Sequence, residues 1–272
     1  MAPVSWRTEQ PMDLGLKNKT ALVLGGGGGL GRAIAKALAG EGANVAVAGI
    51  GPDSIAGTEA ALAAIGGKSI GLVWDLAELS QADAKISKIE SELGPVDILV
   101  NNTGGPPPTP ASSTDPALWS KHFQAMVLSV IAITDRVLPN MRARHWGRVI
   151  TSTSSGVVAP IPNLAISNAL RLSLVGWSKT LAREVAKDGI TANIVLPGRI
   201  ATDRTKFLDQ AKAKREGRNV EDVSAESAGN IPVGRYGKPE EYGDVVAFLA
   251  SERAAYITGS VIRVDGGMIA SI

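Results

Sequence analysis

Short apolar runs alternate with stretches of helical periodicity along the whole chain. The apolar runs predict seven strands, at residues 21–24, 44–48, 69–74, 96–100, 147–152, 191–196 and 261–264. The stretches between them predict helices at 30–40, 54–65, 81–93, 117–143 and 164–187. Strands that are apolar throughout are typical of parallel sheets buried on both faces, which need crossover connections. We therefore predict an α/β fold, a single Rossmann-like doubly wound parallel sheet of about seven strands with helices on both faces.

The chain shows no linker and no shift in composition after its first residues. We expect residues 14–272 to form one domain, and residues 1–13 to form a polar, poorly ordered tail. A highly charged stretch at 203–228 interrupts the alternation before the last helix. Insertions there usually lie at the carboxyl edge of the sheet, where ligands bind, so we interpret this stretch as a substrate-side flap. A solvated helical excursion is the alternative.

Composition excludes several classes of function. The 272 residues include no cysteine, which rules out disulfides, thiolate catalysis and cysteine-ligated metals. Only two histidines are present, and no spacing suggests a metal site. The net charge of +2 predicts neither nucleic acid nor a membrane as a partner. Without an apolar signal or spanning segment, a cytoplasmic location is expected.

Five consecutive glycines, residues 25–29, join the first predicted strand to the first predicted helix. In a doubly wound sheet this turn is the phosphate site, because glycines allow close backbone approach and the helix N-terminus offers free N–H groups. The run fits two glycine spacings equally well, one using Gly26, Gly28 and Gly31, the other using Gly25, Gly29 and Gly31. Its position between strand and helix favours dinucleotide binding over a merely flexible turn.

The choice between NAD and NADP stays open at this point. An acidic residue at the end of the second strand commonly binds the adenosine ribose of NAD. Here that position is Gly49, followed by Ile50, so neither a carboxylate nor an adjacent basic residue marks the preference.

Five short motifs follow one another in order along residues 14–272. They are Gly25-x-x-x-Gly29-Leu30-Gly31, Asp75-Leu76, Asn101-Asn102-Thr103-Gly104, Pro197-Gly198-Arg199-Ile200-Ala201-Thr202 and Val264-Asp265-Gly266-Gly267. Together they resemble the short-chain dehydrogenase/reductase family, closest to its 3-oxoacyl-carrier-protein reductase-like members. The resemblance implies NAD or NADP binding by Gly25, Gly28, Gly29, Leu30, Gly31, Asp75, Leu76, Asn102, Thr103, Gly104, Arg171, Pro197, Gly198, Ile200 and Thr202.

The catalytic positions are where this chain departs from the family pattern. Ser154 matches the family's catalytic serine. Ser167 stands where the resemblance places a tyrosine, Arg171 where it places a lysine, and Met126 where it places an asparagine. We predict a site built from Ser154, Ser167 and Arg171.

These replacements change the acid–base chemistry. A phenol has a pKa near 10, whereas an alkyl hydroxyl is several units more basic and shorter. Arginine keeps its proton, so Arg171 can bind a phosphate, ribose hydroxyls or an oxyanion but is a poor acid. The three tyrosines, Tyr236, Tyr242 and Tyr256, all lie late in the chain, and we interpret Tyr236 as a packing residue.

Two functional hypotheses follow from these residues. The first is an NAD(P)-dependent oxidoreductase that interconverts a small-molecule carbonyl and alcohol with non-standard catalytic residues. The second is a catalytically silent nucleotide-binding or scaffold subunit that partners an active paralogue. The resemblance also implies a homo-oligomer, a tetramer or dimer assembled through the helices at 117–143 and 164–187.

Overall fold

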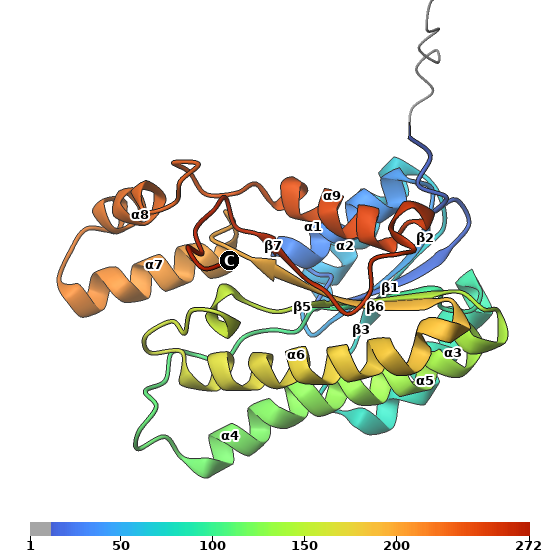
Figure 1. Ribbon diagram of the computed structural model, residues 1–272, viewed down its shortest axis with the longest axis horizontal. Helices are drawn as coiled ribbons and strands as arrows, with labels where there is room; N and C mark the ends of the chain where they lie inside the picture. The colour runs from blue at the N-terminus through green and yellow to red at the C-terminus, as the bar shows by residue number, and fades with distance from the viewer. Residues whose placement is uncertain (1–11) are drawn as a thin grey trace, which may run out of the picture.

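The computed structural model describes residues 12–272, and most of the predicted tail at 1–13 lies outside these residues. The described chain forms one seven-stranded parallel sheet of order β3-β2-β1-β4-β5-β6-β7, which confirms the predicted fold class (Figure 1). The strands are β1 (Thr20–Leu24), β2 (Asn44–Gly49), β3 (Ser69–Val73), β4 (Ile98–Asn101), β5 (Gly147–Ser152), β6 (Ile190–Pro197) and β7 (Val261–Val264).

One strand starts later than the sequence predicts. We expected the fourth strand to begin at residue 96, but Val96 and Asp97 precede β4. Asp97 accepts a hydrogen bond from the Thr20 N–H through Oδ2 at 2.9 Å, and its own N–H donates to the Thr20 carbonyl. These bonds place Asp97 beside the start of β1 as a connection into the sheet.

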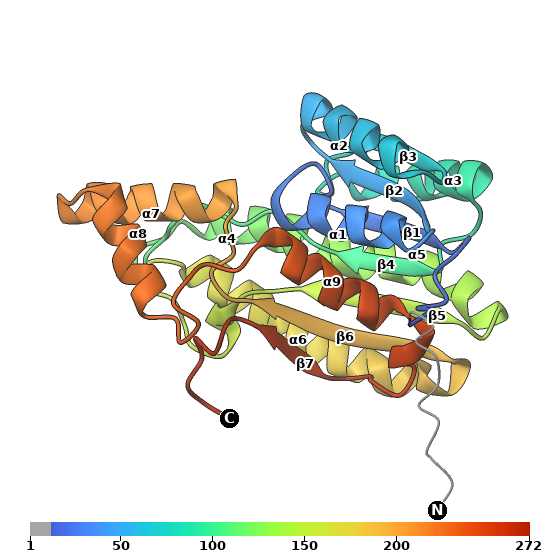
Figure 2. The same cartoon turned by 90° about the horizontal axis from the view of Figure 1, so that it is seen from above.

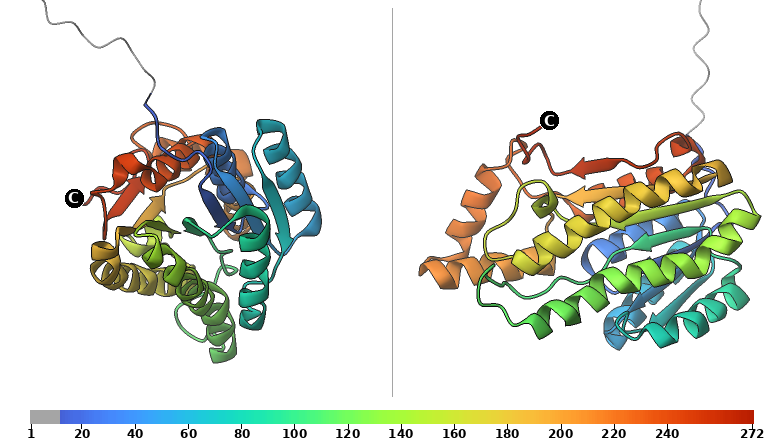
Figure 3. Two further views of the ribbon diagram at one scale, coloured as in Figure 1. Left: turned by 90° about the vertical axis from the view of Figure 1, so that its right-hand side faces the viewer. Right: turned by 60° about the horizontal axis from the view of Figure 1, so that its bottom comes forward.

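Helices cover both faces of the sheet (Figures 1 and 3). One face carries α1 (Gly29–Gly40), α2 (Pro52–Ile65) and α9 (Pro239–Ala250); the other carries α3 (Ala82–Leu93), α5 (Ser129–Ala143) and α6 (Ala165–Val185). On the first face α1 packs closely on α9, because Gly243 leaves no side chain between them. Buried aliphatic side chains fill both layers, as the apolar strands predicted.

The predicted helix at 117–143 is a continuous helical run from Pro116 to Ala143 with a π-helical turn inside it. It consists of α4 (Pro116–Phe123), a π-helical turn at Gln124–Leu128, and α5. Met126 and Val127 lie in that turn and are buried against Ile166 and Leu170 of α6. A single π turn shifts the phase of the helix by about one residue, which is too small a change for hydrophobic periodicity to locate in a sequence.

The charged stretch at 203–228 is helical. It forms α7 (Asp203–Glu216) and α8 (Val220–Gly229), which project past the carboxyl ends of the strands (Figure 2). Thr202 caps α7 by accepting a hydrogen bond from the Thr205 N–H at 3.3 Å. These helices therefore lie at the edge of the sheet where ligands bind in doubly wound folds.

Two kinds of feature are absent from the described residues. Within 12–272 no helix is both long and apolar enough to cross a bilayer. The same part of the chain holds no group of three or more histidine or carboxylate side chains placed to bind a metal ion.

Candidate active site

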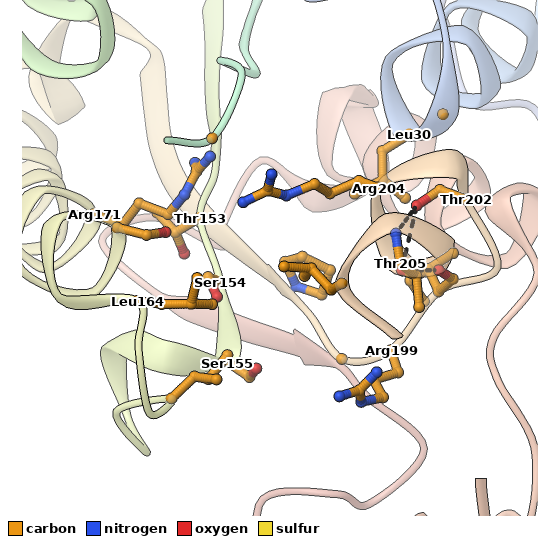
Figure 4. Close-up of a pocket in the computed structure, with 18 of the residues that line it drawn as sticks. Leu30, Thr153, Ser154, Ser155, Leu164, Arg171, Arg199, Thr202, Arg204 and Thr205 are labelled. Carbon is orange, nitrogen blue, oxygen red and sulfur yellow. Dashed lines mark hydrogen bonds between the residues drawn. The ribbon is translucent and has the colours of Figure 1, made fainter. Parts of the chain in front are cut away.

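A cleft of about 920 Å³ opens at the carboxyl ends of the strands, between the glycine turn and α7 (Figure 4). It brings together most of the predicted site residues. Those that line it are Gly25, Gly28, Gly29, Leu30, Asn102, Thr103, Gly104, Ser154, Ser167, Arg171, Pro197, Gly198, Ile200 and Thr202. The predicted cofactor residues Gly31, Asp75 and Leu76 do not line the cleft.

The glycine turn has a conformation that other residues would not tolerate. Gly25 has φ +59°, and a Cβ there would lie 2.4 Å from the Asn102 carbonyl oxygen. A Cβ on Gly31 would lie 2.1 Å from the Gly25 carbonyl oxygen, so Gly31 shapes the turn from beneath it. Asn102 donates from Nδ2 to the carbonyls of Leu24 and Gly25, both at 3.3 Å. The turn is therefore fixed by close backbone packing and by one side chain.

Gly28 differs from its neighbours. It is the N-cap of α1 in an extended conformation, and a Cβ built on it would meet no atom within 4 Å. Because Gly28 lines the cleft, that space lies directly in front of the free N–H groups of α1. A diphosphate fits this cradle: it needs exposed amides, the positive end of a helix and no side chain in the way.

No charged side chain stands at the end of β2, the position that commonly distinguishes NAD from NADP in doubly wound folds. Gly49 ends β2 and Ile50 is largely exposed. Asp75 follows β3 at the same edge of the sheet, and its carboxylate accepts a hydrogen bond from the Ala77 N–H at 3.0 Å. Asp75 is exposed and lies apart from the cleft residues.

Hydroxyl groups gather where β5 ends. Ser154 follows the strand, and its Oγ accepts a hydrogen bond from the Gly156 N–H at 3.1 Å. Ser167 lies in the first turns of α6, is buried and also lines the cleft. Within the described residues, the buried hydroxyls of Thr103 and Thr153, which line the same cleft, have no hydrogen-bond partner. Such groups are paired in most folded proteins, so these two are suited to contact a ligand.

Arg171 points from α6 into the cleft and is 7% exposed. Its guanidinium donates to the carbonyls of Ser152 at 3.3 Å, Thr103 at 3.2 Å and Gly104 at 3.3 Å. Burial lowers the pKa of Arg171 to about 10, so the side chain stays cationic at neutral pH. The bonds tie the ends of β4 and β5 together and place a positive charge beside Ser154.

Within residues 12–272, which hold all three tyrosines of the chain, none of them lines the cleft. Tyr242 is buried under the sheet, shares a hydrogen bond of 2.8 Å with Ser152 Oγ and has its pKa raised by burial. Tyr236 donates to Asp209 Oδ2 at 2.8 Å, and burial raises its pKa too. Asp209 on α7 also accepts from Arg199 Nη1 at 2.5 Å. Tyr236 therefore holds α7 in place, which agrees with the packing role we predicted for it.

Arg204, in the first turn of α7, lines the cleft but was not among the predicted site residues. Its Nη2 donates to the Pro106 carbonyl at 2.7 Å, across a sequence separation of 98 residues. Burial lowers its pKa. The only hint in the sequence is its place two residues after Thr202, which ends the motif that begins at Pro197.

The parallel sheet, the glycine turn and the cleft at the strand ends define a nucleotide-binding α/β protein of the doubly wound class. Comparison with known proteins narrows this class. The family model described as "Enoyl-(Acyl carrier protein) reductase" matches residues 26–269. The chain belongs to the short-chain dehydrogenase/reductase family, which confirms the resemblance seen in its motifs.

Its relatives are similar over almost their whole length. The chain is 37% identical over 258 residues to 3-oxoacyl-(acyl-carrier-protein) reductase FabG of Escherichia coli, covering 94% of this chain and 99% of that protein. It is 36% identical over 261 residues to D-beta-hydroxybutyrate dehydrogenase of Cupriavidus necator, with coverage of 94% and 99%. The solved L-sorbose reductase of Gluconobacter frateurii, complexed with NADPH and L-sorbose, superposes with a TM-score of 0.90 at 32% identity, covering 96% of this chain and 100% of that one.

Proposed function

We propose that this chain is an NAD(P)-dependent oxidoreductase that interconverts a carbonyl and an alcohol, with Ser154, Ser167 and Arg171 at the reacting end of the cleft. The observation that carries the proposal is that these three side chains line the same cleft as the glycine turn. A cofactor seated on the α1 N-terminus would share that space with them. The names of the relatives, which describe reductases and dehydrogenases, support the reaction class.

The cleft residues fit a nicotinamide dinucleotide. The open space at Gly28 and the free amides of α1 suit its diphosphate, and Thr202 lies beside Gly29 at the same place. Pro197, Gly198 and Ile200 form the wall next to the catalytic hydroxyls. The nicotinamide would exchange a hydride with the substrate carbon. NADPH in the L-sorbose reductase structure supports a cofactor of this type. Because β2 ends at Gly49, which has neither a carboxylate nor a basic side chain, the choice between NAD and NADP stays open.

The protein's own groups then serve the substrate oxygen. Ser154 can donate a hydrogen bond to it, and the cationic Arg171 stabilises the negative charge that develops there. Neither is a good proton donor at neutral pH, and no phenol lines the cleft, so we propose that water supplies the proton. General acid catalysis typically contributes about two to four orders of magnitude in rate, and we expect slow turnover for want of it.

One observation favours the second hypothesis, a catalytically silent nucleotide-binding or scaffold subunit. The guanidinium of Arg171 already donates to three backbone carbonyls. This geometry suits a side chain that only holds the ends of β4 and β5 together. The two hypotheses share the cofactor cradle and differ only in turnover.

Calorimetric titration with NADH and NADPH, followed by turnover assays on a panel of small ketones and oxo acids, tests the proposal. Turnover that falls about tenfold or more in Ser154→Ala, with cofactor affinity unchanged, supports the oxidoreductase. A folded sample that binds cofactor but shows no turnover supports the silent subunit. Failure of both nucleotides to bind at millimolar concentration refutes both hypotheses.

Three further expectations belong to this proposal. We propose that residues 14–272 act as one catalytic domain and that 203–228 is the substrate-side flap. We also propose a homo-oligomer, because Phe123, Leu128 and Leu172, on or beside the long helices α4, α5 and α6, are exposed apolar side chains. Light scattering on a sizing column tests the assembly, and a monomer at micromolar concentration would contradict it.

A further inference from the structure

The cleft contains more positive than negative charge. Its acidic lining residues are Asp203 and Glu216. Five cationic side chains line it, and three of these have a carboxylate partner: Arg199 with Asp209, Lys212 with Glu226 and Arg215 with Glu216. The other two are Arg171 and Arg204. Among the described residues, neither has a carboxylate oxygen within 4.0 Å.

Both unpaired guanidinium groups are anchored to the same short loop after β4. Arg171 donates to the carbonyls of Thr103 and Gly104, and Arg204 donates to the carbonyl of Pro106. Arg171 reaches the loop from α6 and Arg204 reaches it from α7. Figure 4 shows the two side chains extending toward one another from opposite sides of the cleft. Shared anchoring on residues 103–106 therefore sets the two positive groups at a fixed separation.

This arrangement is unfavourable for the protein alone. Burial lowers the pKa of both arginines, and the charge of Arg204 lowers that of Arg171 further. Two like charges repel strongly where solvent screening is weak. An anion between them would remove the repulsion. Arg204 donates to one carbonyl only and keeps enough N–H groups to bind a carboxylate through two parallel hydrogen bonds, whereas Arg171, whose Nη2 already serves two carbonyls, contributes its charge and single N–H donors. Thr103, the first residue of this loop, has an unpartnered hydroxyl that is an additional donor.

We propose that Arg204 binds a carboxylate of the substrate and that the nearby positive charge of Arg171, which also faces the reacting oxygen, helps to hold it, so that the natural substrate is a small oxo acid or the matching hydroxy acid. This inference rests on the proposed function for the reaction itself. The cofactor's diphosphate has its own cradle at Gly28 and α1. Arg171 instead lies at the hydroxyl-lined end, beside Ser154 and Ser167. A carboxylate held there is close to the reacting carbon, which limits the substrate to a short acid.

The experiment compares acetoacetate with its uncharged methyl ester on the cofactor-loaded protein. The variants are Arg204→Gln, which removes the charge, and Arg204→Lys, which keeps it. We expect Arg204→Gln to reduce kcat/KM for acetoacetate about 10- to 100-fold and to change that for methyl acetoacetate less than about threefold. Arg204→Lys should retain part of the preference for the acid. Calorimetric binding of acetoacetate to the complex with oxidised cofactor gives a readout without turnover.

The outcomes separate this inference from the proposed function. If neither compound is reduced, but the wild-type protein binds acetoacetate and Arg204→Gln does not, the carboxylate site stands while the proposed function fails. If Arg204→Gln lowers kcat/KM equally for acetoacetate and its methyl ester, or lowers it for neither, the carboxylate site is overturned. Weakened NADPH binding with an unchanged preference for the acid also overturns it, because Arg204 would then serve a phosphate of the cofactor.

Discussion

Replacing Arg171 with methionine tests whether this arginine serves a ligand or the fold. Methionine keeps the length of the side chain but removes the charge and the donors. The pKa of Arg171 falls from 12.5 to about 10, chiefly through burial. At about 1.4 kcal/mol per pKa unit, burying the cation costs roughly 3.5 kcal/mol of stability. The substitution removes this penalty.

The substitution also removes three hydrogen bonds. Their lengths of 3.2 to 3.3 Å exceed the roughly 2.8 Å typical of charge-assisted bonds, so each contributes at the low end, about 0.5 to 1 kcal/mol. Their sum of about 1.5 to 3 kcal/mol offsets most of the burial penalty. We therefore expect the free energy of unfolding of Arg171→Met to lie within about 1 to 2 kcal/mol of wild type. In a chain of this size, that is a change in Tm of about 4 °C or less.

The matched control is Arg148→Met. Arg148 is also buried, donates to the carbonyls of Gly147, Gly189 and Ser251, and stacks on Trp146, but it does not line the cleft. We expect this control to lose about 3 kcal/mol in denaturant unfolding and to bind cofactor and acetoacetate normally. Arg171→Met should lose acetoacetate binding instead. Normal binding together with a loss above about 4 kcal/mol in Arg171→Met would show that its role is structural.

Four other variants give distinct results. Gly28→Ala should leave stability unchanged, because its Cβ meets nothing, yet weaken cofactor binding in calorimetry, whereas Gly31→Ala should lose at least about 2 kcal/mol in denaturant unfolding. The double variant S167Y/R171K should raise kcat by about two to four orders of magnitude by restoring a proton donor; unchanged kcat would contradict our view of Ser167. Burial raises the pKa of Tyr242, so wild-type stability should fall above about pH 10, where only the unfolded phenol ionises; pH-dependent unfolding of Tyr242→Phe should lack this fall.

Much of the fold could be predicted because local pattern and burial agree. The strands of a buried parallel sheet are apolar along their whole length, and six of the seven were placed to within about a residue at each end. The errors arose where tertiary contacts override pattern. Asp97 precedes β4 although its backbone bonds to Thr20 and Arg148 of the neighbouring strands, and its carboxylate accepts from the Thr20 N–H. The π turn at 124–128 was not predicted, and Met126 within it packs on α6, a contact between distant segments.

The glycine turn was predictable because backbone shape determines residue type there, and the family resemblance selected Ser154, Ser167 and Arg171, which line the same cleft. Gly25 and Gly31 were recognisable because no other residue fits their positions. Arg204 was missed because its importance depends on a contact with Pro106 that no local pattern encodes. The partners of Arg171 were equally hidden, since main-chain carbonyls leave no mark in a sequence.

The two ends of the described chain differ in their distance from the cleft. Leu14 bonds to the backbone of Glu252 and Asp13 to the side chain of Arg253, at the edge where the strands begin. Met268 and Ile269 instead line the cleft. An affinity tag fused after Ile272 would therefore follow directly on the segment that lines the binding site, whereas the described chain begins at the opposite edge of the sheet. Proteins prepared for ligand measurements should be tagged accordingly.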